Sequence, residues 1–134
     1  MKALICNSKN WFKLEDKNKE GFETKFATKK EDLEVSFLND FQPNFIFFVH
    51  WNWQVKREIY ENFNCIVFHT SPLPYGRGGS PIQNLILEGF DSSPVCALKM
   101  TSSLDAGPIF SKIDVSLKGS LSEIFERING ATNN

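Results

Sequence analysis

Several features that would place this chain of 134 residues in a particular class of protein are scarce. The chain has two histidines and three cysteines, and the cysteines (Cys6, Cys65 and Cys96) are widely separated, without the C-x-x-C spacing of a structural zinc site. We therefore predict that the cysteines are reduced core residues and that the chain holds no metal.

Long apolar runs and an excess of one charge are also missing. The longest apolar run, 45–49, is too short to cross a bilayer, and the N-terminus lacks the extended apolar region of a signal peptide. The formal net charge is -1, whereas binding to phosphate backbones usually needs a basic excess or patch. We therefore expect a cytoplasmic protein whose partners include neither membrane nor nucleic acid.

Apolar segments of strand length alternate with segments of helical periodicity. We expect strands over residues 2–6, 22–27, 45–49, 65–68, 95–100 and 109–115, and helices over 33–41, 55–63, 81–89 and 121–130. The first two strands are close together for a full crossover helix, and the last two are close enough to be antiparallel. The pattern predicts one three-layer, Rossmann-like α/β domain over residues 1–134 with a mostly parallel, mixed sheet.

Capping signals mark the ends of the predicted helices. Thr28 followed by Glu31 has the spacing of a capping box, and Pro43 ends the helix that follows. Pro81 suits the first turn of the third helix. We expect Gly130 to end the last helix.

The most informative segment runs from Val67 to Pro81 and reads VFHTSPLPYGRGGSP. It places His69 at the end of an apolar strand, before a proline-braced loop and a glycine-rich turn. Ligands of open α/β sheets bind beyond the carboxyl ends of the strands, so we expect His69 to be exposed there. Its imidazole is a candidate general acid or base; the alternative is a histidine that only hydrogen-bonds a loop.

A second tight turn, 103–108, carries a carboxylate. Asp105 either caps its own backbone in this turn or acts beside His69, where it would orient the ring and favour its protonated form. The two interpretations are compatible, because a turn can also aim a catalytic group. We therefore predict a site that contains both residues.

Two further segments border this predicted site. The turn with Tyr75, Arg77 and Gly78 matches neither the Walker pattern nor G-x-G-x-x-G, which disfavours nucleotide hydrolysis and dinucleotide binding. The turn is either a tight connection or a contact with an anionic substrate. The segment His50–Trp53 follows the neighbouring strand, and its aromatic side chains either cap the core or form a wall for a flat ring.

The two motifs, in this order and at this separation, resemble those of the formyltransferases that use 10-formyltetrahydrofolate. The resemblance extends over residues 49–115. Four family motifs have counterparts here. The Asn-x-His motif corresponds to Val67 and His69, and the Ser-Leu-Leu-Pro loop corresponds to Ser71–Pro74. The turn of a basic residue and glycine corresponds to Arg77–Gly78, and the Leu-Asp-x-Gly motif corresponds to Leu104–Gly107.

The resemblance implies that an amine attacks the formyl carbon, that His69 stabilises the resulting oxyanion, and that Asp105 supports His69. It implies contacts with the folate for Ser71, Pro72, Leu73, Pro74, His50, Trp51, Asn52 and Trp53. Contacts with the acceptor are expected for Tyr75, Arg77 and Gly78.

Two departures from the family pattern bear on activity. Val67 stands where the family has asparagine, and an isopropyl group cannot donate a hydrogen bond to an oxyanion. Losing one such donor costs about a hundred- to a thousandfold in rate, so we expect His50 or Asn52 to replace it, or activity to be poor. The chain is also short for the family, and its polar end after Gly130 predicts a catalytic domain truncated at the C-terminus.

The sequence of residues 73–86 is similar to that of formyltransferases that act on nucleotide-linked amino sugars, such as the enzyme of the pseudaminic-acid pathway. Formyl transfer from 10-formyltetrahydrofolate to such a small-molecule acceptor is therefore the leading hypothesis. The alternatives are a methionyl-tRNA formyltransferase-like enzyme and a non-catalytic remnant that binds folate or a nucleotide sugar. Apolar surface left by truncation would be covered in a homo-oligomer.

Overall fold

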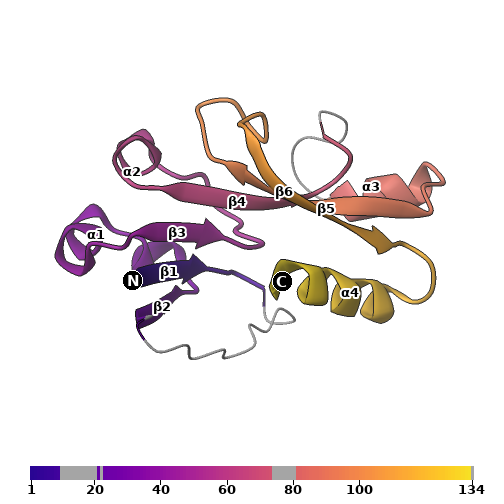
Figure 1. Ribbon diagram of the computed structural model, residues 1–134, viewed down its shortest axis with the longest axis horizontal. Helices are drawn as coiled ribbons and strands as arrows, with labels where there is room; N and C mark the ends of the chain where they lie inside the picture. Colours follow the sequence, from indigo (N-terminus) through magenta and orange to yellow (C-terminus); the bar gives the residue numbers. More distant parts are fainter. Residues whose placement is uncertain (10–20, 22, 74–80, 134) are drawn as a thin grey trace.

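The computed structural model of the chain describes residues 1–9, 21, 23–73 and 81–133. Its strands are β1 (Lys2–Cys6), β2 (Glu23–Ala27), β3 (Phe45–Phe48), β4 (Cys65–Thr70), β5 (Ser92–Lys99) and β6 (Ile109–Ser116). Its α-helices are α1 (Val35–Phe41), α2 (Arg57–Asn62), α3 (Pro81–Leu87) and α4 (Leu121–Asn133). Figure 1 shows the strands as one twisted sheet in the order β2-β1-β3-β4-β5-β6.

The sheet is mixed and mostly parallel, which confirms the predicted fold class. β1 pairs in parallel with β2 and β3, and β3 pairs in parallel with β4. β5 is antiparallel to both β4 and β6. β3 is apolar throughout because a parallel strand in the middle of a sheet is covered on both faces.

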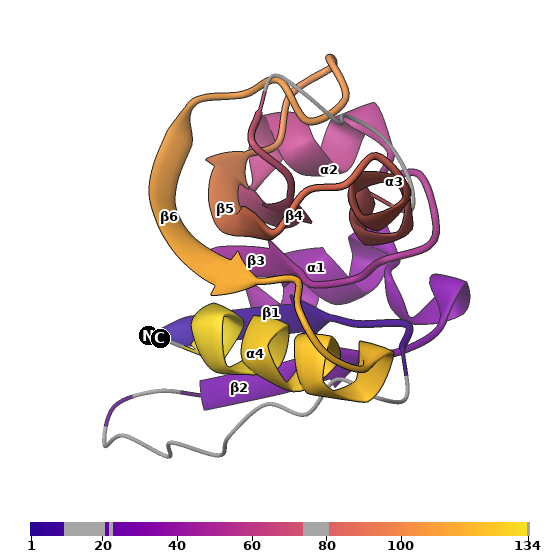
Figure 2. The ribbon, with the colours of Figure 1, turned by 90° about the vertical axis from the view of Figure 1, so that its right-hand side faces the viewer.

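Helices cover the two faces of the sheet (Figure 2) and make it the middle layer of three. On one face, Leu4 and Phe48 pack with Leu38 of α1 and Ile59 of α2 in one core cluster. Phe68 belongs to the opposite face, because successive residues of a strand point to alternate sides. It contacts a second cluster, to which α3 and α4 contribute Ile82, Leu85, Ile124, Ile128 and Ala131.

All three cysteines are buried and without disulfides, as predicted. Burial disfavours the charged thiolate, which raises the pKa of Cys65 to about 12 and also raises the pKa of Cys6 and Cys96. These thiols are therefore protonated at neutral pH and serve as small apolar core residues.

The first helix does not begin as predicted. The backbone N–H groups of Thr28 and Lys29 donate to the carboxylate of Asp32 at 3.0 and 3.1 Å, so Asp32 rather than Glu31 accepts the capping hydrogen bonds. These bonds hold the pKa of Asp32 below its usual value. A 3-10 turn forms first, and α1 begins only at Val35.

The predicted end of the last helix is also wrong, because Gly130 lies inside α4. The helix continues beyond it since Ala131, only 9% exposed, packs into the second core cluster after Ile124 and Ile128. Tertiary packing therefore outweighs the low helix propensity of glycine. Across the described residues, no helix is long and apolar enough to cross a membrane.

Helix α3 agrees with the sequence signals at both ends. Pro81 is its first residue, and Gly89 follows it with a φ of 87°. The N–H of Gly89 donates to the carbonyl of Ile86 at 3.1 Å, and that of Phe90 donates to the carbonyl of Leu85 at 3.0 Å. This is the Schellman pattern, which satisfies the last carbonyls of a helix.

Candidate functional site

Strand β4 extends two residues further than predicted, so His69 lies within the strand rather than in the loop after it. There it pairs with Cys96, and Thr70 pairs with Val95. The side chain of His69 is only 7% exposed, so the expectation that it is exposed is wrong. The cause is β5, an antiparallel neighbour that continues alongside the carboxyl end of β4.

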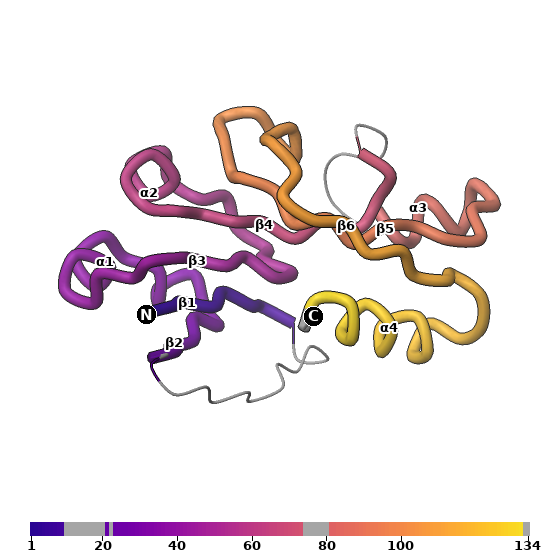
Figure 3. The backbone as a smooth tube through the Cα atoms, viewed as in Figure 1, coloured from indigo at the N-terminus to yellow at the C-terminus, as the bar shows by residue number. Residues whose placement is uncertain are grey.

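The structure brings His69 and Asp105 together, as the sequence predicted. Nδ1 of His69 lies 3.3 Å from Oδ2 of Asp105, and the Asp105 side chain is also 7% exposed. The pair joins the carboxyl end of β4 to the connection between β5 and β6, which Figure 3 shows as an orange arch beside β4. Low exposure strengthens the interaction, because little water screens it.

Gly107 explains how the Asp105 turn can approach the sheet so closely. A Cβ atom at Gly107 would lie 1.8 Å from the carbonyl oxygen of Lys99, a distance that no side chain tolerates. The N–H of Lys99 donates to the carbonyl of Pro108 at 2.9 Å and closes the turn. Asp105 has a φ of 49°, in the left-handed region that aspartate adopts more readily than bulky residues.

An irregularity in β6 lies next to this turn. The register shifts between Ala97 and Leu98, whose partners on β6 are Ser111 and Ile109. Phe110 is therefore an extra residue on β6, a β-bulge, and it is 61% exposed. Bulges often occur beside functional sites, where they redirect the chain.

The geometry of the pair assigns different roles to the two ring nitrogens. Nδ1 of His69 can donate a hydrogen bond to the carboxylate of Asp105, which orients the ring. Nε2 then lies on the opposite side of the ring. A histidine held in this way is suited to stabilise an oxyanion or to transfer a proton through Nε2.

The segment His50–Trp53 follows β3, next to the end of β4. His50 has a φ of 55°, and its carbonyl oxygen accepts a hydrogen bond from Oγ of Ser8 at 2.6 Å. The same Oγ accepts a hydrogen bond from the N–H of Asn52 at 3.1 Å. Ser8 therefore fixes this turn to the end of β1.

The aromatic side chains of this turn pack against the core. Trp51 makes an edge-to-face contact with Phe48, with ring centroids 6.2 Å apart, and a second with Trp53 at 4.9 Å. These contacts support the interpretation that Trp51 caps the core. A role of the two rings as a wall for a flat ligand stays a prediction.

His50 is a neutral histidine at physiological pH. Its burial, and secondly the positive charge of Lys9, lower its pKa from 6.5 to about 4.

The loop after His69 begins with a serine that is fully buried. The carbonyl of Ser71 accepts hydrogen bonds from the N–H of Leu73 at 2.9 Å and from Sγ of Cys96 at 3.5 Å. Pro72 and Leu73 are partly exposed, and their contact with folate stays a prediction. The predicted site residues Pro74, Tyr75, Arg77 and Gly78 lie outside the described residues.

Val67 packs with the first core cluster, opposite Phe48 of β3 and Leu98 of β5. Its surroundings are apolar, as its side chain requires. Val67 therefore contributes a partly buried apolar side chain, and no hydrogen-bond donor, at this position of β4.

Two residues with a part in this site were not identified from the sequence. Ser8 follows β1 by two positions, so the rule that picks out the carboxyl ends of parallel strands could have found it. Gly107 belongs to the Asp105 motif, but its close approach to Lys99 is visible only in three dimensions. Within the described residues, no group of three His, Cys, Asp or Glu side chains could hold a metal ion.

Comparisons with known proteins connect this geometry to a family. No protein-family model matches the chain. The chain is 33% identical over 94 residues to the methionyl-tRNA formyltransferase of Rickettsia typhi, a match that covers 69% of this chain and 31% of that protein. The chain therefore spans less than a third of the length of this relative.

Solved structures give the same result. A methionyl-tRNA formyltransferase from Clostridium thermocellum matches with a TM-score of 0.91 and 38% identity, over 100% of this chain and 61% of that chain. A phosphoribosylglycinamide formyltransferase from Bacillus halodurans matches with a TM-score of 0.72, over 99% of this chain and 90% of that one. Its identity is 16%, so this second match shows a shared fold.

Proposed function

The chain belongs to the formyltransferase family, and we propose that it transfers a formyl group from 10-formyltetrahydrofolate to the amine of an acceptor. The observation that carries this proposal is the buried contact of 3.3 Å between His69 and Asp105 at the carboxyl end of β4. An acid held at this edge of the sheet is placed where open α/β folds bind their ligands.

In the proposed reaction, the lone pair of the acceptor nitrogen forms a bond with the formyl carbon, and the carbonyl electron pair moves to oxygen. His69, held through Nδ1 by Asp105, stabilises this oxyanion through Nε2. The bond between the carbon and N10 of the folate then breaks, N10 takes up a proton, and the acceptor nitrogen loses one. Asp105 can accept that proton through water.

The residues around His69 are compatible with a folate-linked donor. Ser71 provides a buried hydroxyl two residues after His69, and Trp53 lies at the neighbouring strand end, partly exposed. The donor supplies the formyl group, while the protein supplies orientation and a site of low exposure. The contacts of Pro72, Leu73 and His50–Trp53 with the donor belong to this proposal.

The comparisons favour methionyl-tRNA as the acceptor over the nucleotide-linked amino sugar predicted from the sequence. The relatives described above at more than 30% identity are methionyl-tRNA formyltransferases. The amino-sugar hypothesis depended on residues 73–86, which fall partly outside the described residues. It has no support from these relatives, so methionyl-tRNA replaces it as the main proposal, and a nucleic acid becomes the proposed partner, contrary to the expectation from the net charge.

The test is a product assay with competing acceptors. The purified chain is incubated with 10-formyltetrahydrofolate and either methionyl-tRNA or a panel of UDP- and dTDP-linked amino sugars, and formylated product is detected by mass spectrometry. We expect formyl-methionyl-tRNA above the level of a His69→Ala control. A formylated sugar instead would overturn the acceptor, and product from neither acceptor would overturn transfer by this chain.

A further inference from the structure

Ser71 has a buried hydroxyl whose hydrogen-bonding capacity is not used. The residue is 0% exposed, and its Oγ has no hydrogen-bond partner among the residues that the structure describes. A buried hydroxyl without a partner lowers the stability of the folded state, and such groups in native proteins are rare enough to need an explanation. One explanation is a hydrogen-bond partner that is present only during a reaction.

The backbone around this hydroxyl is held in place from two sides. The Ser71 carbonyl accepts the N–H of Leu73 at 2.9 Å and Sγ of Cys96 at 3.5 Å. Cys96 is also the residue directly opposite His69 on β5. The backbone that carries the hydroxyl is therefore linked, through Cys96, to the strand position opposite His69.

Strand geometry relates Ser71 to the position of the missing oxyanion donor. Residues two apart along an extended strand point to the same face. Val67 lies two residues before His69 within β4, on the same face as the imidazole, and Ser71 is the first residue beyond the strand, two positions after His69. Val67 has an apolar side chain and packs with the first core cluster, so it donates nothing.

We propose that the hydroxyl of Ser71 donates a hydrogen bond to the oxygen of the formyl group as negative charge develops there, in place of the donor that Val67 lacks. This inference rests on the proposed function and extends the role implied for Ser71 from bordering the folate to catalysis. The bonds made and broken are those described above; Ser71 keeps its proton and shares it with the oxyanion.

The other candidates fit less well. Asn52 is exposed, and its backbone N–H donates to Ser8 in the turn after β3. The carbonyl of His50 is held by the same serine, so both residues belong to the neighbouring strand end. Ser71 alone of the three lies on the same chain segment as His69.

The test separates catalysis from stability. Ser71→Ala removes the hydroxyl, and we expect kcat to fall about a hundredfold. The melting temperature should stay unchanged or rise, because the substitution removes a buried polar group that has no partner. A fall in melting temperature that accounts for the lost activity would overturn the proposal and assign Ser71 a structural role.

Ser93 provides the matched control. It is also buried, at 2% exposed, but its Oγ donates to the carbonyl of Pro94 at 3.3 Å. Ser93→Ala should therefore lower the melting temperature and leave kcat unchanged. Equal effects of the two variants on kcat would contradict a special role for Ser71.

A second experiment combines Ser71→Ala with Val67→Asn. If Ser71 compensates for Val67, an asparagine at position 67 should restore most of the kcat lost by Ser71→Ala in the double variant. A double variant as slow as Ser71→Ala would refute this compensation. If the unaltered chain forms product and Ser71→Ala is equally fast, only this inference fails; if the unaltered chain forms no product with any acceptor, the proposed function fails with it.

Discussion

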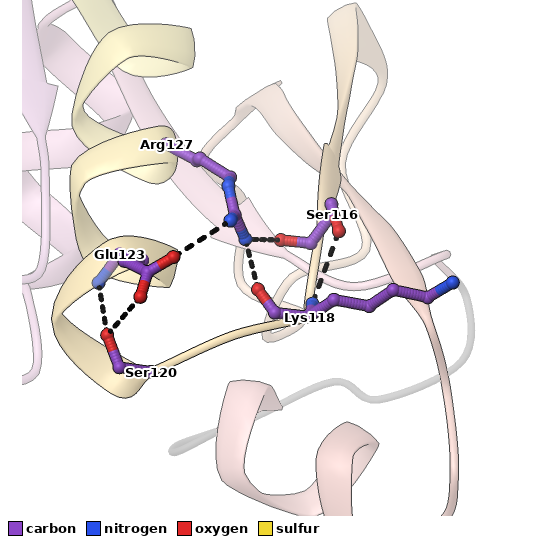
Figure 4. A network of polar contacts seen from close by, with 5 residues as sticks. All are labelled: Ser116, Lys118, Ser120, Glu123 and Arg127. Carbon is purple, nitrogen blue, oxygen red and sulfur yellow. Dashed lines mark hydrogen bonds and ion pairs between the residues drawn. The ribbon is translucent and has the colours of Figure 1, made fainter.

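Two polar clusters in this chain differ in how completely their groups are satisfied. At the junction of β6 and α4, Arg127 donates from Nη1 to the carbonyl oxygens of Ser116, at 3.0 Å, and of Lys118 (Figure 4). Its Nη2 lies 3.6 Å from Oε2 of Glu123. Ser120, the residue before the helix, caps α4: its Oγ accepts the N–H of Glu123 at 3.2 Å, and its hydroxyl donates to Oε1 of Glu123 at 3.0 Å.

The cluster of His69, Asp105 and Ser71 has the opposite properties. Its side chains are almost fully buried, whereas the side chain of Glu123 is 60% exposed. The Ser71 hydroxyl is unsatisfied within the described residues. The Arg127 cluster thus uses its donors on the protein itself, whereas the Ser71 hydroxyl is left for the oxyanion in the role proposed above.

The largest effect is expected from substitutions in the His69–Asp105 pair. His69→Ala and Asp105→Asn should each lower kcat by about a hundred- to ten-thousandfold. In the proposed mechanism His69 contacts the oxyanion, and Asp105 acts through the His69 ring. Circular dichroism should show an unchanged fold. Near-normal turnover of the His69 variant would refute the mechanism, whereas a slow Asp105→Asn enzyme with normal KM would support a role in positioning.

Gly107 tests whether the turn must approach the sheet. Gly107→Ala would force the chain away from the Lys99 carbonyl, with a loss of about 1–3 kcal/mol in the free energy of unfolding and a displaced Asp105. Misplacement by about 1 Å can cost a hundredfold in rate. Urea unfolding and kcat measure the two effects.

Gly130 is the control for this substitution. A Cβ there would meet nothing within 4 Å, and the residue lies inside α4. Gly130→Ala should therefore stabilise the protein by about 0.5–1 kcal/mol and leave kcat alone. If both glycine variants behave alike, the close approach at Gly107 is not what holds Asp105.

Acid should weaken the protein through His50. In the folded chain its pKa is about 4, whereas an unfolded chain has the ordinary value near 6.5. Between these values the unfolded state takes up a proton that the folded state does not, so stability present above pH 6.5 is lost as the pH falls toward 4. The expected loss is on the order of 2 kcal/mol.

Urea unfolding at pH 7 and at pH 4.5 measures this loss. The His50→Gln variant should show a smaller difference between the two pH values than the unaltered chain. An equal difference in both proteins would mean that other groups carry the acid sensitivity.

The smallest effect is expected at the satisfied cluster. Arg127→Met should lower the free energy of unfolding by about 1 kcal/mol, because the carbonyls of Ser116 and Lys118, which precede α4, lose a charged donor that is partly exposed to water. We expect kcat to stay unchanged. A Glu123→Gln control isolates the exposed ion pair, which should contribute only about 0.3–0.5 kcal/mol.

Local signals were sufficient where the chain's own periodicity decides the structure. The apolar run before Val49 predicts β3, and Pro81 with Gly89 predicts the limits of α3. They failed at Gly130, where burial of Ala131 in the second cluster continues a helix that propensity would end. At the first helix, Glu31 and Asp32 offer similar carboxylates one position apart, and only the path of the turn selects Asp32.

The candidate site divides in the same way. The motifs at 67–74 and 104–107 predict that His69 acts together with Asp105 because they resemble those of the formyltransferases. The burial of both side chains could not be predicted, since it depends on β5 running alongside the end of β4.

The sequence alone predicts the order of strands and helices, the mixed sheet and the buried reduced cysteines, because periodicity and turn chemistry act over a few residues. Its resemblance to the formyltransferases predicts the His69–Asp105 pair. The tertiary structure decided that His69 is buried, that Gly107 lets the turn approach Lys99, and that the Ser71 hydroxyl is enclosed without a partner among the described residues. These properties depend on how separate segments of the chain pack against one another, and no local pattern of residue types records such packing.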